Sequence, residues 1–234
     1  KRGDCVDEQE SCTFLAMCGI VGYVGSRPAK DVIIDGLRRL EYRGYDSAGL
    51  AVVSDGALHW AKKSGKLTNL EAELSTSPLP ESGQGIGHTR WATHGAPTDT
   101  NAHPHVSADG TVAVVHNGII ENFSTLRAEI EAAGIELESE TDSEVAAHLL
   151  ALAYNEGETA GDFQASALQV LSRLEGAFTV LFVHADHPGT IIAGRRSTPL
   201  IVGVGEGETF LGSDVAAFID RTKNAVELGQ DNAV

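Results

Sequence analysis

The chain has 234 residues, with 17 basic and 33 acidic side chains and a formal net charge of −16. This length suits one globular domain with a substantial core, and the acidic charge argues against binding to nucleic acid or to an anionic membrane. No stretch is apolar over the roughly 18 residues that a membrane span needs, and no signal peptide is visible. Three cysteines cannot all pair with one another, so we expect a cytoplasmic protein.

The sequence contains a single methionine, Met17, and 16 residues precede it. This segment is polar, has no periodic apolar pattern and contains Cys5 and Cys12. We expect residues 1–17 to be a leader, a tag or a pro-segment that includes the initiator methionine, and we favour a tag or a mis-assigned start over a pro-segment. The domain itself is then expected to span residues 18–234.

From residue 18 onward, apolar spacing predicts strands, then helices, then strands. The expected strands are 19–24, 50–53, 58–61, 85–88, 112–116, 178–183, 190–193, 200–204 and 209–211. The expected helices lie near 28–40, 66–74, 121–133, 145–152 and 167–174. This order favours two sheets covered by helices over a strict alternation of strand and helix.

Glycines follow or interrupt several of these strands. Asn117 and Gly118 follow one strand, and they allow a tight turn or an oxyanion hole made of an amide and a main-chain N–H. A helical pattern follows them directly, which weakens the hairpin interpretation. Two glycine-rich stretches, 83–87 and 203–207, complete no nucleotide-binding motif, and we interpret both as turns.

Cys18 is a candidate nucleophile, although a buried structural cysteine is the alternative. A cysteine attacks as thiolate and needs a base, and the α-amino group of an N-terminal Cys18, with a pKa of about 8, could serve. Residues 88–95 (HTRWATHG) are dense in hydrogen-bond donors. Arg90 there could bind a carboxylate through two hydrogen bonds, or simply pair with an acid on the surface.

Five histidines lie between residues 88 and 116 and raise the possibility of a metal site. They show no established metal-binding spacing, so we expect no metal, and we assign to His103 and His105 hydrogen bonds that order a loop. Thr141-x-x-Glu144 matches a capping box at a helix start. Capping does not require Asp142, whose carboxylate could bind a ligand ammonium group.

Six segments occur in an order that we recognise: MCGIVGYVG (17–25), RRLEYRGYDSAGLAV (38–52), HTRWATHG (88–95), NAHPH (101–105), VVHNGIIEN (114–122) and SETDSE (139–144). Together they closely resemble the glutaminase domains of the glutamine–fructose-6-phosphate aminotransferase family, which are class II glutamine amidotransferases and N-terminal-nucleophile hydrolases. The resemblance implies an α+β fold, namely a four-layer αββα sandwich of two mainly antiparallel sheets.

The resemblance also implies roles for individual residues. Cys18 would attack the side-chain amide of L-glutamine with its α-amino group as base, and Asn117 and Gly118 would form the oxyanion hole. Arg90 would bind the α-carboxylate of glutamine, and Asp142 its α-ammonium group. Further residues implied to line, seal or shape this pocket are Trp91, Thr93, His94 and Arg43.

The resemblance implies neither a metal nor an organic cofactor. Members of the family carry a second half that binds fructose 6-phosphate, so we expect this chain to hydrolyse glutamine and to need that half, in a homodimer, to make glucosamine 6-phosphate. The alternatives are another class II amidotransferase, a catalytically blocked glutamine-binding module and a metallo-hydrolase. While residue 17 remains attached, the nitrogen of Cys18 is an amide and cannot act as a base.

Overall fold

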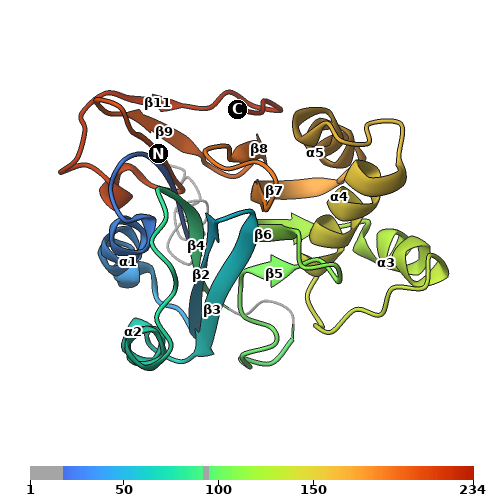
Figure 1. Cartoon of the computed structure of the whole chain (residues 1–234), viewed down its shortest axis with the longest axis horizontal. Helices are drawn as coiled ribbons and strands as arrows, with labels where there is room; N and C mark the ends of the chain where they lie inside the picture. Colours follow the sequence, from blue (N-terminus) through green and yellow to red (C-terminus); the bar gives the residue numbers. More distant parts are fainter. Residues whose placement is uncertain (1–17, 92–94) are drawn as a thin grey trace, which may run out of the picture.

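The computed structural model describes residues 18–91 and 95–234. Two antiparallel sheets pack face to face between two layers of helices (Figure 1). The predicted α+β, four-layer αββα architecture is confirmed. The ends of several strands meet along one edge of this sandwich, and that edge positions the candidate site.

The larger sheet has the strand order β11-β9-β10-β1-β4-β2-β3, and all neighbouring strands are antiparallel. Its strands are β1 (Gly19–Val24), β2 (Ser47–Ser54), β3 (Ala57–Ser64), β4 (Gln84–Arg90), β9 (Ile201–Val204), β10 (Thr209–Gly212) and β11 (Ala225–Glu227). The helices of this layer are α1 (Ala29–Arg39) and α2 (Leu67–Thr76), with the short 3-10 turns η1 (Glu41–Arg43) and η2 (Val215–Ala217).

The smaller sheet has the order β5-β6-β7-β8 and is covered by the other three helices (Figure 1). Its strands are β5 (His105–Val106), β6 (Val112–Ile120), β7 (Gly176–His184) and β8 (Ile192–Arg196). The helices are α3 (Phe123–Ala132), α4 (Glu144–Glu156) and α5 (Phe163–Arg173). Because β5 is only two residues long, the far half of β6 has no strand beside it on that side among the described residues.

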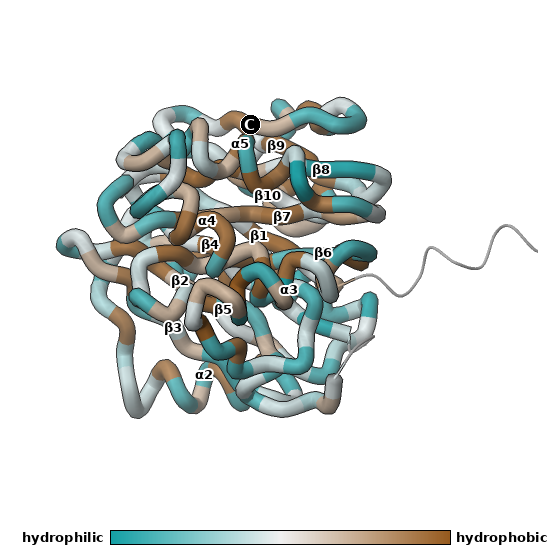
Figure 2. Tube along the Cα trace, turned by 90° about the vertical axis from the view of Figure 1, so that its right-hand side faces the viewer, coloured by the Kyte–Doolittle hydropathy of each residue, from teal (hydrophilic) through white to brown (hydrophobic). Residues whose placement is uncertain are grey.

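The strands alternate their side chains between two cores, as a pleated strand must. In β1, Ile20 packs between the two sheets, whereas Val21 packs against the helices of the larger sheet. In β6, Val115 packs between the sheets and Val114 packs against α3–α5. Figure 2 shows the hydrophobic segments gathered in the central strands, with hydrophilic residues on the outer loops. Apolar burial therefore holds all four layers together.

Two sequence-based interpretations of glycine were wrong. The strand expected at 85–88 is present within β4, so Gly85 and Gly87 lie in a strand and not in a turn. Glycine is needed there because α1 crosses so closely that a Cβ at Gly87 would lie 2.2 Å from Ile33 Cγ2. Asn117 and Gly118 do not form a turn either. Strand β6 continues through them to Ile120, and Gly118 pairs with Phe178 of β7.

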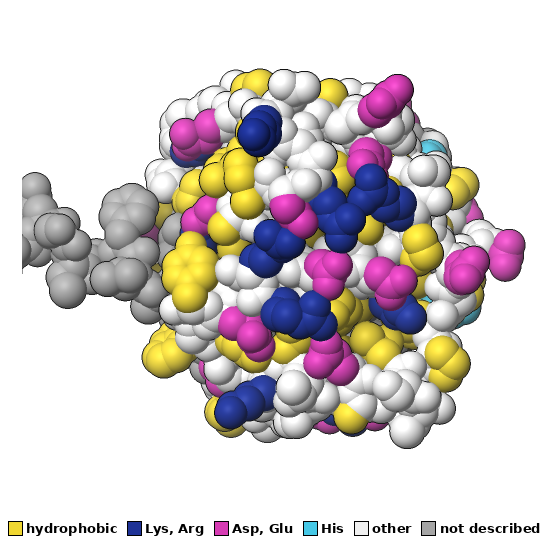
Figure 3. Space-filling model, turned by 90° about the vertical axis from the view of Figure 1, so that its left-hand side faces the viewer, with side chains coloured by type: hydrophobic (Ala, Val, Ile, Leu, Met, Phe, Trp, Pro, Cys, Tyr) yellow, Lys and Arg dark blue, Asp and Glu magenta, His cyan; other side chains and the backbone are white. Residues whose placement is uncertain are grey.

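The face around α1 carries interspersed acidic and basic side chains (Figure 3). Arg38 lies 2.7 Å from Asp35 and 2.5 Å from Glu71, and Arg39 lies 2.5 Å from Asp220. Such exposed ion pairs each contribute about 0–1 kcal/mol to stability. In the part of the chain that the structure describes, no helix is long and apolar enough to cross a membrane.

Candidate active site

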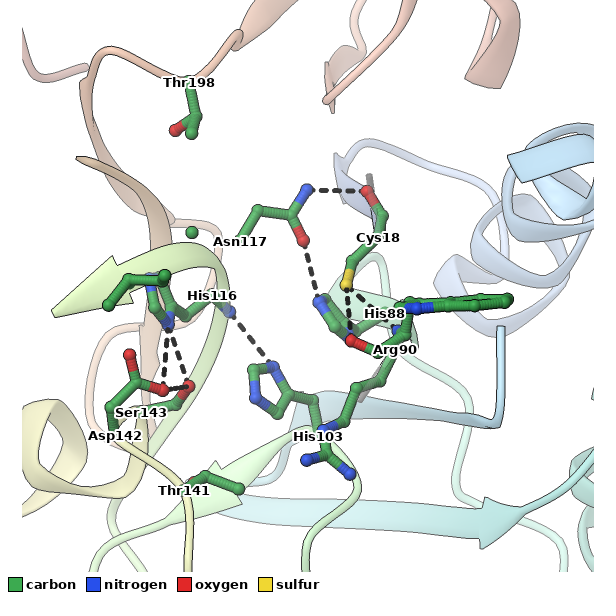
Figure 4. Close-up of a pocket in the computed structure, with 13 residues that line it drawn as sticks. Cys18, His88, Arg90, His103, His116, Asn117, Thr141, Asp142, Ser143 and Thr198 are labelled. Carbon is green, nitrogen blue, oxygen red and sulfur yellow. Dashed lines mark hydrogen bonds and ion pairs between the residues drawn. The ribbon is translucent and has the colours of Figure 1, made fainter. Parts of the chain in front are cut away.

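A cavity of about 210 Å³ opens where β1 and β4 of the larger sheet meet β6 of the smaller one (Figure 4). The main candidate residues line it together: Cys18, Arg90, Trp91, Asn117, Gly118 and Asp142. The remaining lining residues are His88, His103, His116, Ile119, Thr141, Ser143 and Thr198. Cys18 and Asp142 are drawn on opposite sides of the site in Figure 4.

Cys18 comes directly before β1, and the strand register decides what surrounds it. Gly19 pairs with Thr89 of the antiparallel β4, so Cys18 lies beside the end of that strand. The main-chain N–H of Trp91 donates to Cys18 Sγ at 3.1 Å. Burial raises the pKa of the Cys18 thiol, although the Trp91 N–H and the positive charge of Arg90 oppose the shift. The thiol is therefore protonated at neutral pH and needs a base before it can attack.

Asn117 projects from β6 across the gap between the sheets. Its Nδ2 donates to the main-chain carbonyl oxygen of Cys18 at 2.7 Å, and its Oδ1 lies 2.9 Å from His88 Nε2. The side chain is 3% exposed. This amide therefore joins the two sheets directly beside the candidate nucleophile.

Gly118 follows Asn117 with φ = 113°, a conformation that residues with a Cβ rarely adopt. A Cβ at this position would lie 2.0 Å from Ala177 O. Two residues before Gly118, the N–H of His116 donates to His103 Nδ1, and two residues after it the N–H of Ile120 donates to Asp142 Oδ2. Both N–H groups lie on the edge of β6 that faces away from β7. Main-chain groups alternate sides along an antiparallel strand, so the Gly118 N–H lies on that same edge, where the cavity is.

Asp142 is buried at the opposite wall of the cavity. Its Oδ2 accepts the N–H of Ile120 at 2.8 Å, and its Oδ1 accepts the hydroxyl of Ser143 at 3.3 Å. His116 Nδ1 lies 2.8 Å from Ser143 Oγ and 4.0 Å from Asp142 Oδ1. These contacts hold the carboxylate of Asp142 at the cavity wall. None of these described contacts comes from an arginine or a lysine that would neutralise its charge.

The predicted capping box does not form. Helix α4 begins at Glu144 with Ser143 as its N-cap, and no side chain there accepts a capping hydrogen bond. Thr141 Oγ1 instead lies 3.0 Å from both Ser139 Oγ and His105 Nε2. The stretch before α4 is tied to neighbouring loops, and this positions Asp142.

Arg90 is the last residue of β4 and is 5% exposed. Its guanidinium donates to Gly95 O at 3.3 Å and to Ala96 O at 3.4 Å, and it lies 3.9 Å from Asp46 Oδ1. The group keeps its charge at every physiological pH and presents a planar set of donors. It therefore supplies a permanent positive charge to the cavity wall, suited to an anionic ligand group.

Trp91 and Arg43 differ in how they relate to the cavity. Trp91 lines it and is 48% exposed, and its ring lies against Gly44. Arg43 is not among the lining residues. It pairs with Asp214 at 2.6 Å and donates to Ser213 Oγ at 3.4 Å, and that hydroxyl lies 3.5 Å from the carbonyl oxygen of Cys18. The two other predicted pocket residues, Thr93 and His94, lie outside the described residues.

Three buried histidines pack against one another at the cavity, and two of them, His88 and His103, line it. The rings of His88 and His103 are 4.1 Å apart, and those of His103 and His105 are 4.7 Å apart. Burial lowers the pKa of each of these three imidazoles. Across residues 18–91 and 95–234, no group of three or more histidine, cysteine, aspartate or glutamate side chains is arranged to hold a metal ion. The hydrogen bonds predicted for His103 and His105 are present, to His116 N and to Thr141.

Three lining residues were not predicted individually from the sequence. Thr198 comes from the β8–β9 connection and lies 56 positions beyond Asp142, and its hydroxyl bonds to Thr179 Oγ1 at 2.7 Å. Ile119 and Ser143 are neighbours of predicted residues, and only their position relative to the cavity distinguishes them from ordinary strand and helix-end residues. No motif or spacing could have identified Thr198.

The chain is similar to bacterial proteins named glutamine–fructose-6-phosphate aminotransferase [isomerizing]. It is 62% identical over 224 residues to the protein of Mycolicibacterium smegmatis and 63% identical over 218 residues to that of Streptomyces coelicolor. These alignments cover 93% of this chain but only 36% and 35% of the two relatives. The chain thus spans about a third of their length, and the predicted resemblance is confirmed.

Solved structures give the same picture of the fold. A glutamine phosphoribosylpyrophosphate amidotransferase from B. subtilis, complexed with ADP and GMP, superposes with a TM-score of 0.73 at 25% identity, over 90% of this chain and 44% of that one. A structure described as the allosteric regulatory enzyme of purine biosynthesis gives 0.74 at 27% identity, with the same coverage. The family model of the glutamine amidotransferase domain matches residues 88–220. The chain therefore belongs to the glutamine amidotransferase family.

Proposed function

We propose that this chain hydrolyses the side-chain amide of L-glutamine to glutamate and ammonia through a thioester on Cys18. The observation that carries the proposal is that one cavity unites a thiol, an amide donor, a guanidinium and a carboxylate, from Cys18, Asn117, Arg90 and Asp142. Free glutamine has a reactive amide, a carboxylate and an ammonium group. The cavity offers a complementary group for each of them.

Binding would fix the amino-acid end of the substrate, whose carboxylate and ammonium groups share one carbon. Arg90 would hold the α-carboxylate, and Asp142 would hold the α-ammonium group, since charge-assisted hydrogen bonds are about twice as strong as neutral ones. The side-chain amide would then reach Cys18 on the other side of the cavity. Thr93 and His94 would complete the pocket, and Trp91, beside Gly44, would cover its entrance.

Activation of the thiol needs a base, because burial raises the pKa of Cys18. We assign that role to the α-amino group of Cys18, which has a pKa of about 8 when it is free. Residues 1–17 would therefore have to be removed, by cleavage or by initiation at Met17 and loss of the methionine. The active domain would then comprise residues 18–234.

In the reaction, the thiol proton moves to the α-amino group and Sγ attacks the amide carbon of glutamine. Asn117 Nδ2–H and the Gly118 N–H stabilise the negative charge on the amide oxygen, and one such donor lowers the barrier by about 3 kcal/mol. The carbon–nitrogen bond then breaks, and ammonia leaves with a proton from the α-ammonium group of Cys18. Water, deprotonated by the same amine, hydrolyses the thioester to glutamate and free thiol.

The test compares two proteins, one beginning at Lys1 and one whose first residue is Cys18 as verified by intact mass. Release of glutamate from glutamine is expected from the second protein and nearly absent from the first. The Cys18→Ala variant of the shorter protein should be inactive. Equal turnover by both proteins would exclude the α-amino base, and turnover by Cys18→Ala would exclude the thioester.

The named relatives are longer than this chain, and we infer that it works with a second half that uses the ammonia. Following their name, the acceptor would be fructose 6-phosphate. We further infer that the product is glucosamine 6-phosphate and that a homodimer in the cytoplasm makes it. A chain extended by that half should form glucosamine 6-phosphate from fructose 6-phosphate and glutamine. Consumption of phosphoribosyl pyrophosphate in its place would indicate a different class II amidotransferase.

A further inference from the structure

We propose that His88 is a positioning residue that holds the amide of Asn117 in the orientation required for the oxyanion hole. The inference rests on the proposed function, because it assigns to His88 an effect on the same reaction. The carrying observation is that Asn117 is hydrogen-bonded at both ends of its amide, to Cys18 O and to His88 Nε2.

The chemistry of the partners decides which way the amide faces. A main-chain carbonyl oxygen can only accept a hydrogen bond, so the group 2.7 Å from Cys18 O must be the NH₂ of Asn117. The oxygen of the same amide then faces His88 Nε2 at 2.9 Å, and an amide oxygen can only accept. His88 therefore donates this bond, and its Nε2 carries the proton.

The surroundings keep the imidazole in this state. Burial lowers the pKa of His88 to about 3, so the ring is neutral at physiological pH and holds a single proton. The ring packs against that of His103, with the centroids 4.1 Å apart and the planes tilted by 31°, and Nδ1 of His103 accepts the N–H of His116, the residue before Asn117. His88 donates its only N–H to Asn117. The arrangement therefore differs from a cysteine–histidine pair, in which the imidazole bonds to the thiol. Sγ of Cys18 receives its hydrogen bond from the N–H of Trp91.

Two anchored ends fix the plane of the Asn117 amide. One N–H of Nδ2 is used by Cys18 O, and the second lies in the same plane, beside the cavity that Asn117 lines. Preorganised donors stabilise a transition state because they need no reorientation when charge develops. Without His88, rotation about the last side-chain bond of Asn117 is restrained from one end only, and the second N–H loses its fixed direction.

The kinetic test uses the protein that begins at Cys18 and three variants. His88→Phe keeps a ring but removes the donor, His88→Gln restores an N–H near the position of Nε2, and His184→Phe removes a buried imidazole of β7 that does not line the cavity. We expect kcat for glutamine hydrolysis to fall by about 10- to 100-fold in His88→Phe with little change in KM. His88→Gln should recover most of the loss, and His184→Phe should keep the original kcat.

Two readouts separate positioning from general damage. The double variant His88→Phe/Asn117→Ala should be no slower than Asn117→Ala, because His88 acts only through that amide. Alkylation of Cys18 by iodoacetamide forms no oxyanion, so its rate should be unchanged in His88→Phe. A kcat loss below about 10-fold, a slower double variant or an equal loss of alkylation would overturn the inference. If the unsubstituted protein does not hydrolyse glutamine, the proposed function fails instead.

Proton placement can be measured without activity, on the full chain. Long-range ¹H–¹⁵N spectra distinguish the two neutral imidazole tautomers, and the signals missing from His88→Phe identify those of His88. We expect the Nε2–H tautomer throughout the range from about pH 5 to 8. A proton on Nδ1, or titration near the ordinary histidine pKa, would contradict the assignment whatever the enzyme does.

Discussion

Asn117 Nδ2 donates to the main-chain carbonyl oxygen of Cys18 at 2.7 Å, across 99 positions of sequence. Cys18 directly precedes β1, the central strand of the larger sheet, and Asn117 lies in β6 of the smaller one. The contact therefore spans the interface between the two sheets. Packing of the interior between them, and not a local turn, sets the distance between the thiol and the amide donor.

The first prediction concerns Asn117 itself. In the protein beginning at Cys18, Asn117→Ala should lower kcat for glutamine hydrolysis by about 100- to 1,000-fold and leave KM nearly unchanged, because the lost donor acts on charge that develops in the transition state. Steady-state release of glutamate measures both constants. Asn155→Ala, which changes an exposed asparagine bonded to Asp109, is the control. An increase in KM at constant kcat would instead assign Asn117 to substrate binding.

The second prediction concerns the backbone at Gly118. Gly118→Ala should destabilise the protein strongly, because φ is 113° and the new Cβ would lie 2.0 Å from Ala177 O. Gly110 is a matched control, since its φ is 72° and a Cβ there meets nothing within 4 Å. Strain alone should cost Gly110→Ala about 1 kcal/mol, and the clash should cost Gly118→Ala about 1–3 kcal/mol more. Urea unfolding measures both, and equal losses would show that β6 and β7 can separate locally.

The third prediction assigns the charge of Asp142 to the substrate ammonium group. Asp142→Asn keeps an oxygen for the N–H of Ile120 but removes the charge, and KM for glutamine should rise by about 30-fold or more, equivalent to about 2 kcal/mol. Hydrolysis of 4-carbamoylbutanoate, which is glutamine without its amino group, provides the control. The substitution should barely change kcat/KM for that compound. An equal loss on both substrates would show that Asp142 acts on the structure of the pocket.

The fourth prediction is a pH dependence of stability. Burial by itself raises the pKa of Glu144, but hydrogen bonds from His148 and from the main-chain N–H groups of Ser139 and Glu138 lower it from 4.5 to about 2. The folded-state pKa is depressed, so this group stabilises the fold fully above about pH 4.5 and loses that effect as the pH falls towards 2. The contribution is about 3 kcal/mol.

Denaturant unfolding at several pH values tests the role of Glu144. Glu144→Gln should be less stable than the original protein at pH 7, and its stability should fall less steeply between about pH 4.5 and 2. Glu156→Gln, at the exposed end of the same helix, is the control and should keep the original slope. Parallel pH profiles for Glu144→Gln and the original protein would contradict the assignment.

The local pattern of apolar residues was sufficient to predict much of the fold. Short apolar runs predicted most of the strands, because central strands such as β1 and β2 bury one face between the sheets and the other against helices. The antiparallel strands β2 and β3 are joined by Asp55 and Gly56, both with positive φ, a conformation that this pair of residues favours. The tight turn that Asn117-Gly118 also allowed does not form, and Gly118 has a positive φ inside a strand, close to the backbone of β7.

For the site, the sequence by itself determined the chemical groups and their family: Cys18 ahead of a strand, Arg90 at the end of another, and Asp142 unused by helix capping. Only the tertiary structure decided that these groups share one cavity, that Thr198 joins them and that His88 holds Asn117. The types of residue and their spacing indicate which local structures a segment favours and which chemical groups it carries. Contacts between residues far apart in the sequence depend on strand register and on the packing of one sheet on the other, and no local pattern encodes them.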